Sequence, residues 1–360
     1  MSQGVVPPTP AATVAAGIVF PLVGGVMVGL RFYSKHVQRA GYYAEDWLTI
    51  PALLFTTGMG VILTCDGIGV SKRGLSYPAP QPKDPKDLPT FVAPEITAYR
   101  QVQYSLEMMH CLAVTFVKLS FLLFYNRIFV TPMRPVVQWL VWILIVFCTL
   151  WGLGFFSNFM FACGTHFADL WTNLATFKRS CQRIIDVNFW LAITDCILDI
   201  LIFVFPMPLV WNLHMSTTRK LGVLAVFCVG AVTVAASITR MVLFIRVVHN
   251  IRVGYTKSGT GADLLTLTAG LYWTMFETGM ALISVCLPFT YTLYKRWKSK
   301  NTSTFDSSSN ERLGNSISGF RQSRKQRLDD STENIIPLED TNVMVTTDIQ
   351  IQSEPNTKEV

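Results

Sequence analysis

The sequence predicts an all-α fold: a polytopic membrane protein in which a bundle of seven transmembrane helices precedes a disordered C-terminal tail. The first observation behind this prediction is a series of seven long apolar stretches separated by short polar connections. Each is close to the ~20 residues that a helix needs to cross ~30 Å of hydrocarbon. These stretches are apolar almost all round, whereas a helix of a water-soluble protein keeps a polar stripe. The composition agrees, with 51% hydrophobic and only 15% charged residues.

Three segments divide the chain of 360 residues. A short N-terminal tail covers residues 1–10, and the membrane domain covers residues 11–294. Within that domain the predicted helices are residues 11–33, 47–70, 105–129, 136–161, 187–211, 221–247 and 264–294. Residues 295–360 are rich in Ser, Thr, Asn, Asp and Glu and poor in aromatic residues, so we expect a disordered cytoplasmic tail.

The first helix is expected to remain as a membrane span, because residues 1–10 contain no Lys or Arg and a cleavable signal peptide has a basic start. Arg31 at the end of this helix and Lys35 and Arg39 after it are counted with the first loop, and basic loops favour the cytoplasmic side. The Lys and Arg residues of the later loops are divided almost equally between the two sides of the membrane, but four of the six residues from 295 to 300 are basic. We therefore expect an outside N-terminus and a cytoplasmic C-terminus, in the plasma membrane.

The second and fourth connections are long and lie on the proposed outer face. Residues 71–104 contain six prolines, which favour an extended loop over a helix. Residues 164–186 mix aromatic and basic residues, and Cys163 and Cys181 lie in this fourth loop. In an oxidising compartment the two cysteines could form a disulfide; two separate thiols are the alternative. The two loops together could form a surface that contacts a ligand.

The third, fifth, sixth and seventh helices carry charged residues, which are costly in hydrocarbon unless they are paired. Lys118 lies nine residues before Arg127, or ~13 Å from the inner boundary, near the middle of the membrane. On the fifth helix, Asp195 and Asp199 are four residues apart and therefore share a face. A seventh-helix acid, Glu277, lies at similar depth.

Two interpretations of these charges remain open. Lys118 could pair with Asp199 or Glu277 and fix how the third, fifth and seventh helices pack. Alternatively, the intramembrane charges Lys118, Asp195, Asp199 and Glu277, with Arg240 on the sixth helix nearer the outer side, could line the path of a ligand or an ion.

Several classes of function are disfavoured by what the sequence lacks. A retinal protein needs a lysine on its last helix, and residues 264–294 contain none. The five histidines are scattered without the spacing of a zinc hydrolase, and no nucleophile has a base nearby in sequence. We therefore expect no enzymatic activity, no cofactor and no metal site. The basic residues lie beside membrane segments, which suits lipid headgroups rather than nucleic acid.

The segment 118–129, with the sequence KLSFLLFYNRIF, resembles the third-helix signature of the fungal rhodopsin-domain family of seven-helix membrane proteins. Further matching elements follow in the same order as in that family: the acids of Glu45-Asp46-Trp47, the loop cysteines Cys163 and Cys181, the acid-then-proline pattern from Asp199 to Trp211, Arg240, the segment from Trp273 to Glu277, and Cys286-Leu287-Pro288. Asp195 is a departure, because the family often has Asn there, and the Arg-Pro expected after Pro288 is absent.

The resemblance implies a receptor-like membrane protein, and it covers roughly residues 11–294. From it we expect a sensor similar to G-protein-coupled receptors, with a small-molecule ligand bound in the outer half of the bundle. The lipid bilayer surrounds such a protein, and a cytoplasmic signalling protein would bind its inner loops and tail. The alternative is a transporter or an accessory membrane protein for a small secondary metabolite, although no internal repeat supports it. The resemblance also favours a Cys163–Cys181 disulfide.

Overall fold

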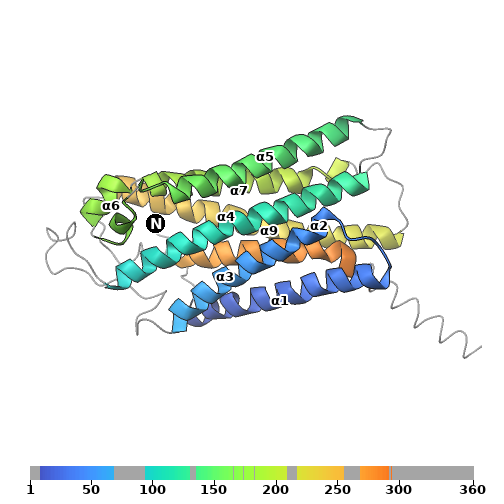
Figure 1. Ribbon diagram of the computed structural model, residues 1–360, viewed down its shortest axis with the longest axis horizontal. Coiled ribbons are helices and arrows are strands. Elements are labelled where there is room, and N and C mark those ends of the chain that lie inside the picture. The colour runs from blue at the N-terminus through green and yellow to red at the C-terminus, as the bar shows by residue number, and fades with distance from the viewer. Residues whose placement is uncertain are drawn as a thin grey trace, which may run out of the picture. The chain divides into compact units, whose positions relative to one another are not determined.

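A computed structural model describes residues 9–68, 94–129, 135–164, 166–172, 174–181, 183–208, 217–254, 268–291 and 293. Within these residues, seven helices are long and apolar enough to cross a membrane, as the sequence predicts. Figure 1 shows them side by side along one common direction. The predicted tail, residues 295–360, lies outside the described residues, as does most of the Pro-rich second loop.

The spanning helices are α1 (Pro10–Val37), α3 (Thr49–Ile68), α4 (Pro94–Phe129), α5 (Pro135–Met160), α7 (Arg183–Val204), α9 (Thr217–Gly254) and a seventh helix, Thr268–Tyr291. Three short elements complete the described chain: α2 (Ala44–Trp47), the 3-10 helix η2 (Phe167–Trp171) and α6 (Leu174–Ser180). At the start of α1, Thr9 accepts a hydrogen bond from the Ala12 amide at 3.3 Å, and Pro10 occupies the first turn, where no intrahelical donor is needed.

One boundary differs clearly from the sequence prediction. The third spanning helix begins at Pro94, eleven residues before the predicted start at 105, so the end of the second loop is helical. This extension is held by the fourth loop: Thr97 donates to the Trp171 carbonyl at 3.2 Å, and Arg100 donates to the Thr172 carbonyl at 2.8 Å. Proline does not oppose the helix here, because it stands at the first residue. Tertiary contacts thus decide a boundary that local sequence does not show.

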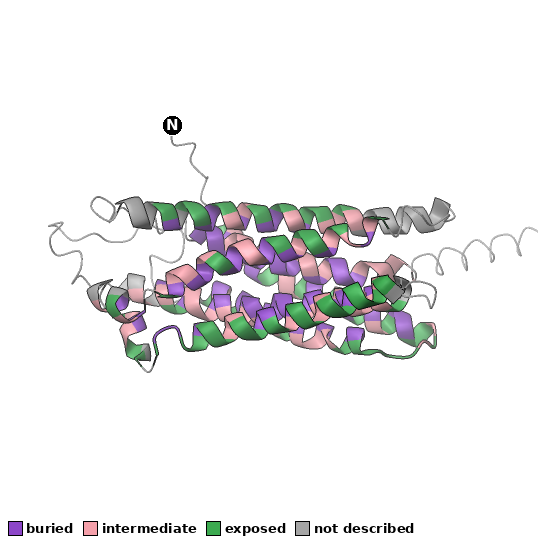
Figure 2. Ribbon diagram, turned by 90° about the horizontal axis from the view of Figure 1, so that it is seen from above, coloured by how far each residue is buried: buried purple, intermediate pink, exposed green. Residues whose placement is uncertain are grey.

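The outward faces of the bundle are apolar, as lipid contact requires. Figure 2 shows exposed residues along the outer sides of the helices and buried residues toward the interior. Leu22, Leu54 and Val136 have 65%, 66% and 70% of their surface exposed. Such a surface would be unstable in water but is favourable in hydrocarbon.

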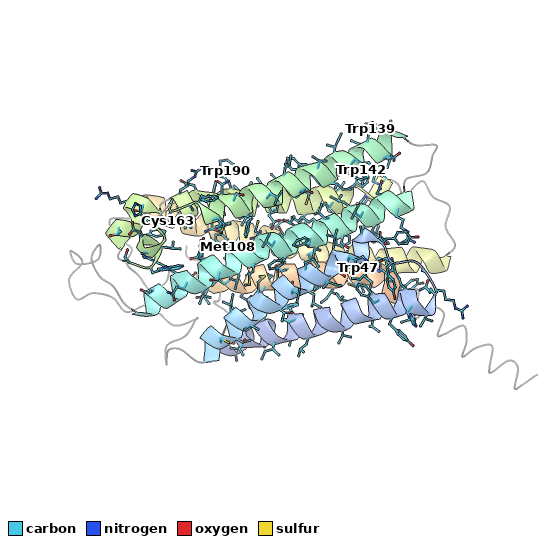
Figure 3. All side chains as sticks on the ribbon, in the orientation of Figure 1. Trp47, Met108, Trp139, Trp142, Cys163 and Trp190 are labelled. Carbon is cyan, nitrogen blue, oxygen red and sulfur yellow. A yellow bond between two sulfur atoms is a disulfide. The ribbon has the colours of Figure 1, made fainter. Side chains whose placement is uncertain are left out.

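Exposed tryptophans gather toward the two ends of the bundle. Trp139 and Trp142 lie near the start of α5, at the same end as Trp47, whereas Trp190 lies toward the other end (Figure 3). Tryptophan is enriched where the hydrocarbon meets the headgroups. The positions of these side chains therefore fit a bundle that crosses the bilayer lengthwise.

The centre of the bundle is formed by α4 and the helix Thr268–Tyr291. In the apolar 18-residue segments of these two helices, 56% and 61% of residues are buried, compared with 22% for the span Val136–Met160 in α5. The peripheral helix α1 approaches α3 closely through glycines: a Cβ added at Gly17 would lie 3.0 Å from the Gly60 carbonyl oxygen. Small residues allow such backbone contact in membranes, where apolar packing supplies the attraction.

Candidate functional site: two buried charge networks

The polar interior contains two separate groups of charged side chains. The first, called the central network below, consists of His110, Lys118, Asp195, Asp199, Arg240 and Glu277. The second, called the inner network, consists of Arg31, Lys35, Glu45, Asp46 and Arg127. Of these eleven side chains only Asp199 and Arg127 are noticeably exposed, at 17% and 41%.

Asp195 is the hub of the central network. One carboxylate oxygen pairs with Lys118 of α4, and the other pairs with Arg240 of α9. The Lys118 ammonium also donates to the Asp195 backbone carbonyl at 3.2 Å and lies 5.2 Å from the Trp151 ring centre. Because Lys118 and Arg240 come from different helices, a single carboxylate on α7 ties α4 and α9 together.

The two carboxylates that the sequence offered as partners of Lys118, Asp199 and Glu277, differ in what they bind. The Lys118 ammonium lies 3.0 Å from Asp199 Oδ1, which is one of the two carboxylates that the sequence suggested. Glu277 pairs instead with Arg240, at 2.6 Å between Oε2 and Nε. The sequence prediction did not name Asp195 as a partner of Lys118, but the ammonium pairs with it as well, because Asp195 and Asp199 share one face of α7.

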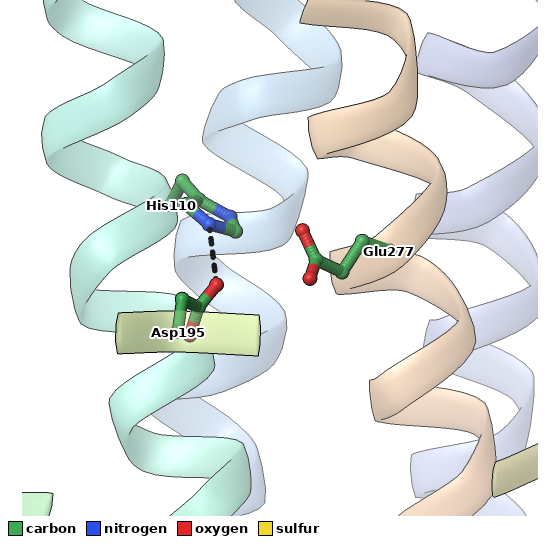
Figure 4. Close-up of side chains that lie close together, drawn as sticks. All are labelled: His110, Asp195 and Glu277. Atoms are coloured by element: carbon green, nitrogen blue, oxygen red, sulfur yellow. Dashed lines mark ion pairs between the residues drawn. The ribbon is translucent and has the colours of Figure 1, made fainter. Parts of the chain in front are cut away.

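His110 enters the network from α4, and sequence analysis did not select it. Its Nδ1 is 2.8 Å from the Thr278 hydroxyl oxygen, and that hydroxyl donates to the Thr274 carbonyl at 2.8 Å. The hydroxyl therefore accepts, so Nδ1 carries a hydrogen. The remaining nitrogen, Nε2, faces Asp195 Oδ2 at 3.4 Å (Figure 4). His110 lies eight residues before Lys118, and this spacing was the available signal that it shares the inward face.

His110, Asp195 and Glu277 offer ligand atoms within 4.8 Å of one another, a spacing that a metal ion can use. Figure 4 shows the three side chains converging from separate helices. Arg240, however, contacts both carboxylates. A divalent cation among these three groups would meet the guanidinium at close range, and this repulsion favours the trio as part of an ion-pair network.

The inner network corrects the placement of two basic residues. Sequence analysis assigned Arg31 and Lys35 to the first loop, but both lie in α1 and are buried. Arg31 Nε is 2.8 Å from Asp46, and Lys35 pairs with both Asp46 and Glu45. The short helix α2 folds back and presents these acids. The two basic charges are thereby neutralised, so they add little to the charge difference across the membrane.

The inner network reaches α4 and the seventh helix as well. Glu45 lies 3.0 Å from Arg127, and its backbone carbonyl accepts from Ser120 at 2.6 Å. Arg31 donates to the Val285 carbonyl at 2.8 Å and stacks on the Phe289 ring at 4.1 Å. Both networks therefore contact α4 and Thr268–Tyr291, the two most buried helices.

At the other end of the bundle, Cys163 and Cys181 form a disulfide, with their Cα atoms 4.5 Å apart. The bond closes the segment that contains η2 and α6, and this segment buries Leu170 and Phe177 beside the disulfide. Arg100 of α4 stacks on Phe177 at 4.9 Å. The fourth loop is therefore a folded cap on the start of α4 rather than an irregular connection.

The chain is similar to a protein of Metarhizium anisopliae named polyenoic acids biosynthesis gene cluster protein Ba17b, with 25% identity over 75% of this chain and 70% of the relative. It is also similar to a SAT4 family membrane protein of Emericella nidulans, with 25% identity over 58% of this chain and 50% of the relative. The third relative is Receptor GIN3 of Arthrobotrys oligospora, with 24% identity over 80% of this chain and 64% of the relative.

The chain thus spans from half to 70% of the length of these relatives. No solved structure matches it. The sequence profile of the fungal rhodopsin domain matches residues 30–296, which include both charge networks and the disulfide. With most of its length matched, and with seven membrane helices, the chain belongs to the fungal rhodopsin domain family.

Proposed function

We propose that this protein is a receptor-like membrane sensor for a small molecule, without retinal and without enzymatic activity. The observation that carries the proposal is the central network, because four helices meet there through ion pairs. Ion pairs in a low-dielectric interior have discrete alternative arrangements, and a ligand that takes one partner changes the others. The two helices shared with the inner network give such a change a route to the opposite end of the bundle.

The proposed orientation places the inner network at the cytoplasmic side. Each helix reverses the direction of the chain, so the segment with Cys163 and Cys181 lies on the same side as the start of α1. Disulfides persist in oxidising compartments, which supports an outside N-terminus at the plasma membrane. A cytoplasmic signalling protein would then meet the ends of α1, α4 and α7. The name of the relative Receptor GIN3 supports the same proposal.

The test uses the full chain in lipid nanodiscs with a fungal heterotrimeric G protein, and it measures binding of a non-hydrolysable GTP analogue. Asp195→Asn releases Lys118 and Arg240 from their shared partner, so we expect nucleotide exchange to change by about fivefold. Thr239→Val, beside Arg240 on α9, is the matched control, because its hydroxyl bonds only its own helix at Ala235. Exchange equal to that of empty nanodiscs in all three samples would contradict G-protein coupling.

Transport of a small metabolite is the second candidate, and the name of the relative from a biosynthesis gene cluster favours it. Charges in the middle of a membrane commonly mark a substrate or ion path. Uptake of labelled small metabolites into proteoliposomes separates the two candidates. Flux that Lys118→Met abolishes, together with no effect on G-protein exchange, would replace the receptor proposal by a transporter.

A further inference from the structure

The central network carries an excess of acid when His110 is neutral. Its three carboxylates are joined by ion pairs to two basic side chains, Lys118 and Arg240. His110 is the sixth member, and an imidazole is the side chain that changes between neutral and positive near physiological pH. The network therefore has one net negative charge with a neutral imidazole, and no net charge after it takes up one proton. In a low-dielectric interior the balanced form is favoured.

The geometry at His110 leaves one nitrogen free for that proton. Nδ1 carries a hydrogen, because the Thr278 hydroxyl at 2.8 Å accepts from it. In a neutral ring Nε2 then has a lone pair, and this nitrogen has no hydrogen-bond partner among the described residues. It faces Asp195 Oδ2 at 3.4 Å, and both side chains are completely buried. Two electron-rich atoms thus lie opposite each other, and a hydrogen on Nε2 would turn the contact into a charge-assisted hydrogen bond.

Glu277 offers a second place for the same proton. Its Oε2 lies 2.6 Å from Arg240 Nε, whereas its Oε1 is buried and has no hydrogen-bond partner among the described residues. One oxygen of Glu277, one nitrogen of His110 and one oxygen of Asp195 lie within 4.8 Å of one another. Figure 4 shows the imidazole and the two carboxylates close together. A proton on either His110 or Glu277 gives the trio the same total charge, so the two groups titrate together.

The helices around this trio do not supply the missing positive charge. Within the described part of the bundle, the other buried ionisable side chains on the central turns of these helices are Glu107, Cys111 and Lys118 on α4, Cys148 on α5, Cys196 and Asp199 on α7, and Arg240 on α9. From α3, apolar side chains such as Met59 and Leu63 pack on α4. Both basic side chains already contact carboxylates. Glu107, one turn from His110, is a further acid outside these ion pairs, so it adds to the excess.

We propose that His110, Asp195 and Glu277 form a site that binds one exchangeable proton. The proton is shared between His110 Nε2 and the Glu277 carboxylate, and Asp195 Oδ2 accepts the hydrogen bond from His110. It comes from water as a hydrated proton, so the only covalent bond formed is an N–H or O–H bond. When the proton leaves, the uncompensated negative charge competes for Arg240, which contacts both carboxylates of the trio. A proton can act as a signal or as a coupling ion in transport, so the inference does not depend on the proposed function.

The experiment detects the proton in the full chain, in phosphatidylcholine nanodiscs at about pH 7. Nitrogen NMR of isotope-labelled histidine reports an imidazolium, and infrared difference spectra in light and heavy water report a carboxylic acid. Glu277→Gln leaves two acids and two basic side chains in the network, so the shared proton should be lost and His110 should be neutral. The signals that this change removes from the wild type should together amount to about one proton per chain. His110→Gln keeps three acids, so the proton should remain there as a carboxylic acid.

Glu45→Gln is the matched control, because it removes a buried acid of the inner network and should leave the signals of the trio unchanged. Any carboxylic acid band from Glu107 is identified by its loss in Glu107→Gln. Raising the pH should remove the signal of the trio from the wild type reversibly, before the bundle unfolds. Identical signals in the wild type and Glu277→Gln would overturn the proposal. So would a signal that persists at every pH at which the protein is folded, or the absence of a carboxylic acid in His110→Gln.

Discussion

Lys118 is the residue whose environment is most clearly defined by the structure. It is 4% exposed and is held by two carboxylates of α7 and the Trp151 ring. Lys118→Met leaves Asp195 and Asp199 without this partner in a dry interior, so we expect a loss of about 3 kcal/mol of stability. Denaturant titration of the purified protein measures the change.

A double-mutant cycle identifies the dominant partner. Lys118→Met combined with Asp195→Asn should regain part of the loss, since the second change removes the stranded charge, and should regain more than Lys118→Met with Asp199→Asn. Coupling below about 0.5 kcal/mol to both acids would show that the ammonium extends toward the headgroups instead.

The sequence shows which charged residues lie within the membrane, but it does not show which of them form ion pairs. Lys118, Asp195, Asp199, Arg240 and Glu277 stand out because ionisable residues are rare in hydrocarbon. Helical spacing puts the two aspartates on one face, but it does not say which helix faces them.

His110 and Glu107 were missed because the predicted start of this span at residue 105 put both near the membrane boundary, whereas the helix begins at Pro94. The burial of Arg31 and Lys35 in α1 could not be predicted either. Their burial depends on α2, a four-residue helix whose acids fold back onto α1.

At the scale of the elements, the fourth loop is a folded unit tied by the Cys163–Cys181 disulfide. The bond closes a segment with a sequence separation of 18, and a loop of this length corresponds to about 3 kcal/mol in the chain-entropy account. Replacing both cysteines by serine should lower stability by about that amount while the seven helices remain. Mass mapping of the unreduced wild type should find the two cysteines in one linked peptide, and two alkylated thiols would refute the bond.

Close contact between α1 and α3 is a second property of the elements. An added Cβ at Gly60 would lie 2.6 Å from Pro21 of α1, so a larger side chain has no room. Gly60→Leu should separate the two helices and cost about 2 kcal/mol. Gly25→Leu, at a position of α1 where an added Cβ meets nothing within 4 Å, is the control and should leave the melting temperature unchanged. Equal losses in the two variants would show that the contact is not specific.

For the whole molecule, seven spans could be predicted because length and apolarity alone define a membrane helix. The ends of those spans could not, since contacts such as Arg100 with the Thr172 carbonyl extend α4 beyond its apolar part. The contacts described above all join residues of the membrane domain. Truncation after Lys300 should therefore leave membrane insertion and the melting temperature near those of the full chain. Degradation of the truncated protein would show that the tail is needed for folding.

We expect the network around Asp195 to govern how the far ends of the helices are arranged. This expectation is tested by pulsed electron spin resonance between nitroxides at Val37, near the end of α1, and Val204, at the end of α7, two exposed positions. The exposed thiols Cys65 and Cys228 are first replaced by serine. The wild type should give one narrow distance distribution, and Asp195→Asn should add a population displaced by about 2 Å or more. Identical distributions in the wild type, Asp195→Asn and the Thr239→Val control would contradict the claim.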